Sequence, residues 1–125
     1  MYRRAFVYAA EETSLPLPLL VAVAQVESQM TADARSGSDA RGLLQVLPST
    51  AAAFRLDVSR PASNVLAGAR YLRQLLDEFQ SPDLALAAYN AGPTAVTRAG
   101  GAPTQETVDY VVNVTTLWRM LRDCR

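Results

Sequence analysis

One carboxylate stands out because of the segment that precedes it. Glu27 follows a run of apolar residues that begins at Leu19. A carboxylic acid in poorly solvated surroundings has a raised pKa, because burial penalises its charged form. The negative end of a helix dipole acts in the same direction. A glutamate that stays protonated near neutral pH can serve as a general acid, although a glutamate at a helix end can equally keep its carboxylate in water.

The rest of the residue inventory narrows the chemistry. The sequence contains no histidine, all 12 basic residues are arginine, and the single cysteine, Cys124, lies near the C-terminus. This excludes Ser-His-Asp and Cys-His catalysis, lysine Schiff bases, the usual zinc sites with histidine and an intrachain disulfide. Any catalysis must therefore use Glu, Asp, Tyr, Ser or Arg side chains.

Further polar residues stand at the ends of apolar segments. Tyr89 and Asn90 come where an apolar helix ends, and Gly92 after them fits a left-handed helix terminus. This is typical of a helix cap, but it also offers a phenol and an amide to a ligand. Gln45 lies among apolar residues, so its amide must bond to backbone, to a ligand or to the catalytic carboxyl. Glu106 begins the last helix, where the dipole favours a carboxylate.

Helices must position these residues, because no segment alternates with the period of a strand. We expect an all-α fold of roughly six or seven helices, with little or no β structure and a loop over residues 31–41. The expected helices span residues 2–13, 18–28, 48–54, 63–79, 84–90, a short stretch from 93, and 104–122.

Three of these expectations concern how helices begin and pack. The helix over residues 18–28 is apolar nearly all round, so it should be a central buried helix. Ser63 has the residue type of an N-cap and should start the long helix that follows it. The last helix should bury one face, made of Val108, Val111, Val112, Thr115, Trp118 and Leu121.

Composition bounds the class of protein. The chain has 125 residues, half of them hydrophobic and 19% charged, which predicts one globular domain over residues 1–125. The formal net charge is zero, so we expect no nucleic-acid partner. No apolar run is long enough to span a membrane, and Glu11 and Glu12 interrupt any export signal. We expect a monomer.

Taken in order, several short blocks carry a family resemblance. They are Glu27-Ser28, Gly42-Leu43-Leu44-Gln45, Ala67-Gly68 with Tyr71-Leu72, Ala88-Tyr89-Asn90-Ala91-Gly92-Pro93, and Glu106-Thr107 with Tyr110-Val111. Over residues 15–121 the sequence resembles the catalytic domain of the soluble lytic transglycosylases, bacterial enzymes of lysozyme-like fold that cut peptidoglycan. Leu44 departs from the methionine that the family often has there, an apolar change of similar volume that should cost little.

The resemblance implies a role for each of these positions. Glu27 matches the catalytic acid and base. Ser36 matches a loop serine that helps to hold the N-acetyl group of the substrate, and Gln45 matches a subsite glutamine. Tyr89 matches the tyrosine beside the reacting sugar, with Asn90 next to it, and Glu106 matches a glutamate of the saccharide groove.

The resemblance also implies a reaction and a setting. The bond between N-acetylmuramic acid and N-acetylglucosamine is cleaved, and a 1,6-anhydro end is formed without water, metal or cofactor. The partners would be peptidoglycan glycan strands and, for a local opening of the wall, a secretion, flagellar or pilus assembly. The expected location is the periplasm or cell envelope. The sequence does not distinguish cleavage within a strand from cleavage at its end.

Two other readings stay open. Asp33 or Asp39, in the loop between Glu27 and Gln45, could place a water, as in a peptidoglycan hydrolase of the goose-type lysozyme kind. The same fold could instead serve as a non-catalytic glycan-binding module. That reading gives no reason for a protonatable Glu27 beside Gln45 and Tyr89.

Overall fold

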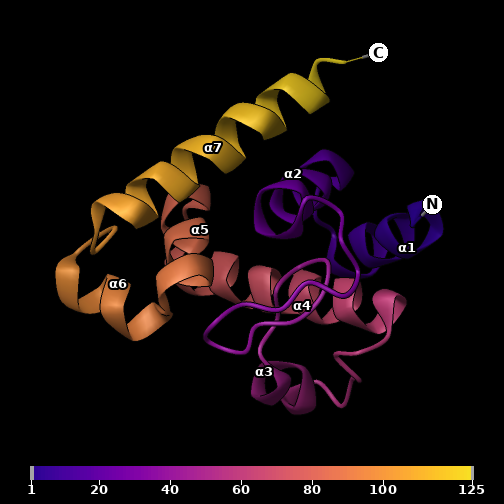
Figure 1. Cartoon of the computed structure of the whole chain (residues 1–125). Helices are drawn as coiled ribbons and strands as arrows, with labels where there is room; N and C mark the ends of the chain where they lie inside the picture. The colour runs from indigo at the N-terminus through magenta and orange to yellow at the C-terminus, as the bar shows by residue number, and fades with distance from the viewer. Residues whose placement is uncertain (1, 125) are drawn as a thin grey trace.

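Seven helices form the fold in the computed structural model, which describes residues 2–124 (Figure 1). They are α1 Arg3–Thr13, α2 Leu17–Ser28, α3 Pro48–Ala53, α4 Pro61–Phe79, α5 Pro82–Ala91, α6 Pro93–Ala99 and α7 Gln105–Arg122. Among these residues there is no strand, only isolated bridges that pair Arg41 with Arg35 and with Val46. The all-α prediction is confirmed, and residues 31–46 form a loop that ends in a turn.

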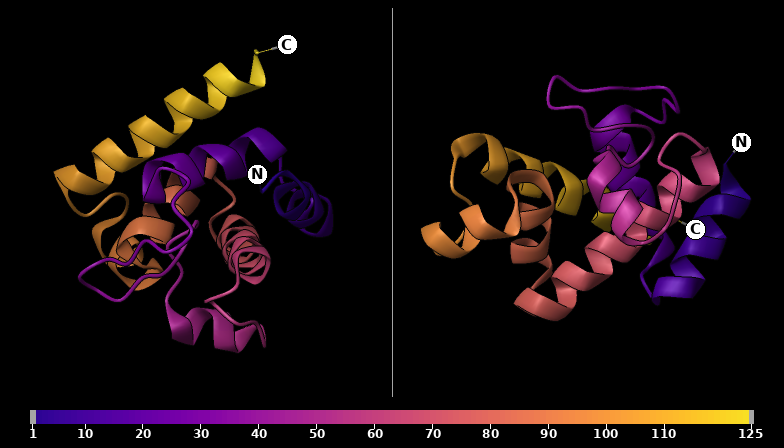
Figure 2. Two further views of the ribbon diagram at one scale, coloured as in Figure 1. Left: turned by 45° about the vertical axis from the view of Figure 1, so that its right-hand side comes forward. Right: turned by 90° about the horizontal axis from the view of Figure 1, so that it is seen from below.

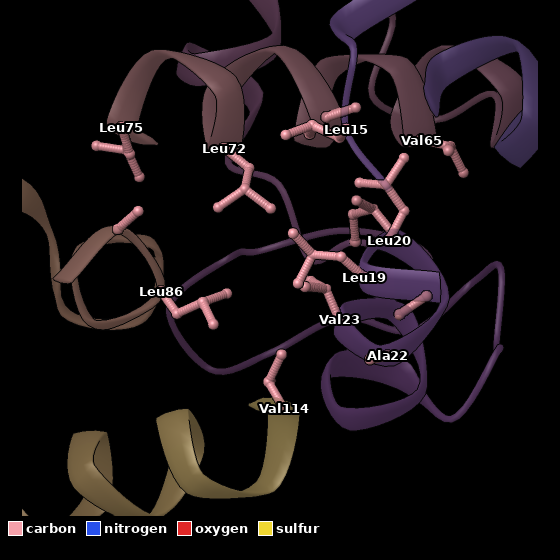
Figure 3. Close-up of a cluster of buried hydrophobic side chains, with 14 of the residues drawn as sticks. Leu15, Leu19, Leu20, Ala22, Val23, Val65, Leu72, Leu75, Leu86 and Val114 are labelled. Atoms are coloured by element: carbon pink, nitrogen blue, oxygen red, sulfur yellow. The ribbon is translucent and has the colours of Figure 1, made fainter. Parts of the chain in front are cut away.

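The central place predicted for α2 is also confirmed. α2 packs against α1 and α7, and α4 packs against α1, α3 and α5. Figure 2 shows α7 lying along α2 on the side away from α4. Five apolar side chains of α2 are fully or almost fully buried: Leu19, Leu20, Ala22, Val23 and Ala24. Figure 3 shows Leu19, Leu20 and Val23 among side chains of α4, α5 and α7, so the helix that carries Glu27 is held on several sides.

Proline also sets the start of α4, where the sequence predicted a serine cap. α2 to α6 each have proline in their first two positions. The prediction that Ser63 caps α4 is wrong, because α4 begins at Pro61 after an extended Arg60. Proline suits the first helical position, since its missing N–H would have no partner there. Ser63 therefore lies inside the first turn.

The buried face predicted for α7 is wrong in part. Val108 and Val112 are 40% and 54% exposed, whereas Thr107, Tyr110 and Val114 are buried. The two hydroxyl side chains face inward because each has a hydrogen-bond partner there, on Asn90 and Glu27. Hydrophobicity alone therefore misplaced the face. The other four predicted residues, Val111, Thr115, Trp118 and Leu121, are partly buried.

Gly92 links α5 to α6 in a conformation that other residues rarely adopt. Its φ is 94° and its ψ is 143°, a region open essentially only to glycine. The left-handed helical terminus expected there is therefore not formed. Between residues 2 and 124, we find no helix with the length and apolar character that crossing a bilayer requires.

Candidate active site

One polar cleft, of about 460 Å³, gathers all six of the residues singled out from the sequence. They come from α2, the loop after it, the turn at residues 42–46, α5 and the start of α7: Glu27, Ser36, Gln45, Tyr89, Asn90 and Glu106. Tyr71 of α4 and Ser38 of the loop also line the cleft. Residues nearly 80 positions apart thus meet around one carboxyl group.

Glu27 lies in the last turn of α2, with its carboxyl largely withdrawn from water. Burial raises the pKa of Glu27 from its ordinary 4.5 to about 7, against the opposing effect of a hydrogen bond from Tyr110. The Tyr110 hydroxyl donates this bond to Glu27 Oε2 over 2.9 Å. A substantial share of Glu27 is therefore protonated at neutral pH, which is what a general acid requires.

The two tyrosines beside Glu27 stay protonated. Burial raises the pKa of Tyr89 and of Tyr110 well above 10, and the charge of a nearby ionised Glu27 adds to both shifts. Their hydroxyls are therefore donors at every pH at which Glu27 titrates. The Tyr110 hydroxyl is placed to stabilise the Glu27 carboxylate once the proton has left.

The Tyr89 hydroxyl is committed to the backbone. It donates to the carbonyl oxygen of Leu44 over 2.7 Å. Its ring centre lies 5.5 Å from that of Tyr71, with 45° between the two planes. The two rings form one aromatic wall of the cleft, a surface suited to the apolar face of a sugar.

Gln45 sits at a left-handed position, with φ 49°, in the turn that faces the loop. Its Nε2 donates to the carbonyls of Ala34 and Gly42, over 3.1 and 2.9 Å. The sequence left open whether this amide bonds to backbone, to a ligand or to the catalytic carboxyl, and the structure shows hydrogen bonds to backbone. No hydrogen bond within residues 2–124 uses Oε1, so that oxygen keeps its capacity to accept.

Ser36 and Asn90 are each fixed by a neighbour. The Ser36 hydroxyl oxygen accepts from the Ala40 N–H over 3.0 Å and lies 3.1 Å from the hydroxyl of Ser38. Thr107 Oγ1 donates to Asn90 Oδ1 over 2.9 Å. This bond sets the orientation of the Asn90 amide, so its Nδ2 is left to donate in the cleft.

The acids proposed to assist hydrolysis do not line this cleft. Asp39 pairs with Arg41 over 2.9 Å and with Arg35 over 2.8 Å. The hydrogen bond from Arg41, with the charge of Arg35, holds the pKa of Asp39 below its ordinary value. Asp33 is exposed. Among residues 2–124, the carboxyls that line the cleft belong to Glu27 and Glu106, and Glu106 is exposed.

Three residues around the site were not singled out as site residues from the sequence: Tyr110, Tyr71 and Asn64. Tyr110 lies four residues after Glu106, about one helical turn. That spacing could have indicated that the two side chains lie near each other on the last helix. The side chain of Asn64 is buried below the turn that carries Gln45, and nothing in its surroundings along the chain marks it. Residues 2–124 contain no group of three or more acidic or cysteine side chains placed to hold a metal ion.

Fold and cleft together define a lysozyme-like domain built around one buried acid. Residues 4–110 match the family described as the Transglycosylase SLT domain, and the chain belongs to that family. The fold is similar to that of an inactive mutant of the lytic transglycosylase Slt from Pseudomonas aeruginosa, with a TM-score of 0.84 and 30% identity over 96% of this chain. The 70 kDa soluble lytic transglycosylase Slt70 of Escherichia coli gives 0.84 and 27% over 97%.

Relatives found by sequence agree with this family. The chain is 38% identical over 102 residues to membrane-bound lytic murein transglycosylase F 2 of Alkalilimnicola ehrlichii, and 31% over 138 residues to a putative soluble lytic murein transglycosylase of Haemophilus influenzae. These matches cover 73% and 90% of this chain. The chain spans about a quarter of the length of these relatives and of the two solved proteins.

Proposed function

We propose that the chain is a peptidoglycan lytic transglycosylase. It would cleave the β-1,4 bond between N-acetylmuramic acid and N-acetylglucosamine and leave a 1,6-anhydro-N-acetylmuramic acid end. The observation that carries this proposal is Glu27, a carboxyl with a pKa of about 7 inside a polar cleft. Membership of the SLT family and the names of the relatives support it.

One carboxyl then performs both proton transfers. Protonated Glu27 donates to the glycosidic oxygen, and the bond from that oxygen to the anomeric carbon breaks. The 2-acetamido group of the substrate supports the positive charge. The Glu27 carboxylate then takes the proton of the C6 hydroxyl of the N-acetylmuramic acid residue. The C6 oxygen bonds to the anomeric carbon of the same sugar, so no water is consumed. A pKa near neutrality suits a group that must act first as acid and then as base.

The remaining cleft residues are proposed to hold the glycan strand. The aromatic wall of Tyr71 and Tyr89 would pack against a sugar ring, since both rings line the cleft. Gln45 Oε1 can accept a hydrogen bond, and Asn90 can donate one. Ser36 and Glu106 would contact polar groups of the sugars on either side of the scissile bond.

The hydrolase alternative has no support from the two aspartates suggested as its second carboxylate. Asp39 is held by two arginines, and neither it nor Asp33 lines the cleft. An inverting hydrolase needs a second carboxylate across the bond to activate water. A non-catalytic glycan-binding module would gain nothing from a buried acid, since burial of Glu27 costs stability when it ionises.

The proposed setting is the periplasm or another part of the cell envelope. The relatives are named as membrane-bound or soluble murein transglycosylases, and one is a transglycosylase of the phage PRD1, 34% identical over 85 residues. Local opening of the wall, for a secretion, flagellar or pilus assembly, is the role we propose. No nucleic acid is expected as a partner of a chain with zero formal net charge.

The products distinguish the two reactions. Sacculi digested with the purified protein would be separated and weighed by mass spectrometry without prior reduction. The proposal expects muropeptides that are one water lighter than reducing-end muropeptides. Reducing ends in their place would establish a hydrolase, and an absence of any release would leave a binding module.

A further inference from the structure

A buried asparagine ties the turn at residues 42–46 to α4. Asn64, near the start of α4, is only 1% exposed. Its Oδ1 accepts from the Leu44 N–H over 2.9 Å, and its Nδ2 donates to the carbonyls of Arg41 and Val58 over 2.8 and 3.0 Å. All three polar contacts go to backbone, so one side chain binds the turn, at Arg41 and Leu44, and the connection between α3 and α4, at Val58.

The turn also packs on α4 without spare room. Gly68 lies four residues after Asn64, on the same face of the helix. A methyl group at Gly68 would lie 2.5 Å from Leu44 Cδ1 and 2.6 Å from Leu44 Cβ. A methyl group at Gly42 would lie 2.5 Å from Asn64 Nδ2. Figure 1 shows the segment between α2 and α3 passing beside α4.

These contacts lead directly to the cleft. The N–H of Leu44 is bound by Asn64, and its carbonyl accepts the hydroxyl of Tyr89. Gln45, the next residue, lines the cleft. One turn beyond Gly68, α4 presents Tyr71, whose ring lies against that of Tyr89. One face of α4, made of Asn64, Gly68 and Tyr71, therefore contacts Tyr89 directly, and it contacts Leu44, the residue before Gln45.

We propose that Asn64 is a positioning residue that sets glycan affinity by fixing the turn that carries Gln45. This inference rests on the proposed function. Asn64 should act on the binding of the strand, because none of its partners takes part in the bond between Tyr110 and Glu27, which joins α7 to α2. The turn does contact α2 beside the acid, since the Ser28 hydroxyl donates to the carbonyl of Leu43 over 2.8 Å. The pH profile is therefore the readout that separates an effect on binding from an effect on Glu27.

The test compares two variants with a matched control. Asn64→Ala removes the three bonds. Gly68→Ala keeps the Asn64 side chain but pushes Leu44, and with it the turn, away from α4, while alanine favours the helix itself. Val65→Ala is the control, because Val65 is fully buried on the same helix and its truncation loosens packing without removing any of the hydrogen bonds that Asn64 makes. The kcat, the KM and the pH dependence of anhydromuropeptide release would be measured on glycan strands purified from sacculi.

The KM should rise about tenfold in Asn64→Ala and in Gly68→Ala, because a displaced Gln45 weakens the binding of the strand and a small loss of binding free energy already gives that factor. The kcat should stay within about threefold of the parent. The pH limb set by Glu27 should stay where the parent has it, and Val65→Ala should keep the parent's KM. Equal KM values in all three variants, or a displaced pH limb, would overturn the inference. Should Asn64→Ala fail to fold, Gly68→Ala decides alone.

The inference and the proposed function can fail separately. A parent protein that releases no muropeptides would overturn the function. Cosedimentation with insoluble sacculi, in a Glu27→Gln background, still tests the positioning role, because it needs no turnover. Weaker cosedimentation of the Asn64 and Gly68 variants than of Val65→Ala supports the role, and equal cosedimentation contradicts it.

Discussion

The Tyr110 hydroxyl and the Glu27 carboxyl, 83 positions apart, are joined by a hydrogen bond of 2.9 Å. Burial and this bond act on the acid in opposite directions. Burial raises the pKa of Glu27 to about 7, and the bond from Tyr110 keeps it from rising further. The bond also ties the last turn of α2 to α7, so it fixes where the proton donor stands.

Tyr110→Phe should therefore change both the rate and the pH dependence. Loss of the donor removes a stabilising contact of the carboxylate, so the pKa of Glu27 rises and the basic limb of kcat/KM moves to higher pH. The kcat should fall about tenfold, because the carboxyl is held less firmly and its charged form is less stable. The pH profile of muropeptide release measures both effects.

Tyr8→Phe is the control for this change. Tyr8 is 56% exposed on α1, so the same loss of a hydroxyl should leave the profile unaltered. A basic limb that stays in place or moves to lower pH in Tyr110→Phe would contradict the role assigned to the bond.

Glu27 should make the folded protein less stable as pH rises. Its pKa is about 7 in the fold and 4.5 ordinarily, so between these values the folded state binds more protons than the unfolded one. Stability therefore falls from about pH 4.5 to about pH 7 and then levels off, by an amount on the order of 3 kcal/mol. Glu27→Gln should lose this dependence and be more stable than the parent at pH 8.

Denaturant unfolding at pH 5 and pH 8 checks this expectation. The gain of Glu27→Gln over the parent should be larger at pH 8 than at pH 5. Glu11→Gln, at an exposed position of α1, should show no such difference. The same gain at both pH values would mean that the carboxyl is not strained by burial.

Thr107→Val should loosen the Asn90 side chain, which lines the cleft. The change keeps the shape of the side chain but removes the bond to Asn90 Oδ1 and the 3.1 Å contact with the Thr104 hydroxyl at the helix start. The free energy of unfolding should fall by about 1 kcal/mol, and kcat/KM should fall several-fold because the Asn90 amide is free to turn. Thr115→Val offers a matched control on the same helix, since Thr115 Oγ1 bonds only to carbonyls of its own helix, at Val111 and Val112. Equal activity of the two variants would show that Asn90 needs no anchor.

Asp39→Asn and Asp33→Asn should leave the reaction intact. Neither side chain lines the cleft, and Asp39 is engaged by Arg35 and Arg41. Asparagine tolerates the positive φ of 71° at position 39. Release of muropeptides should stay within about threefold of the parent. A loss of 100-fold or more in either variant would reopen the hydrolase reading.

Local pattern predicted the helices, and the family blocks pointed to six of the residues that line the cleft, because helix periodicity, most proline starts and these blocks are legible along the chain. What it could not predict depends on contacts between distant residues. Thr107 and Tyr110 turn a mixed helix face inward through their hydroxyl partners, and hydrophobicity assigned that face in part to Val108 and Val112. Asn64 is recognisable as a support only once Leu44 and Arg41 are seen to lie upon it.

The rate of anhydromuropeptide release by Glu27→Gln tests the central claim most directly. Glutamine keeps the size of the side chain but cannot give or take the proton. Release from sacculi should fall at least about 1,000-fold relative to the parent, while the variant still sediments with sacculi. Release at the parental rate would contradict the assignment of Glu27 as the acid and base.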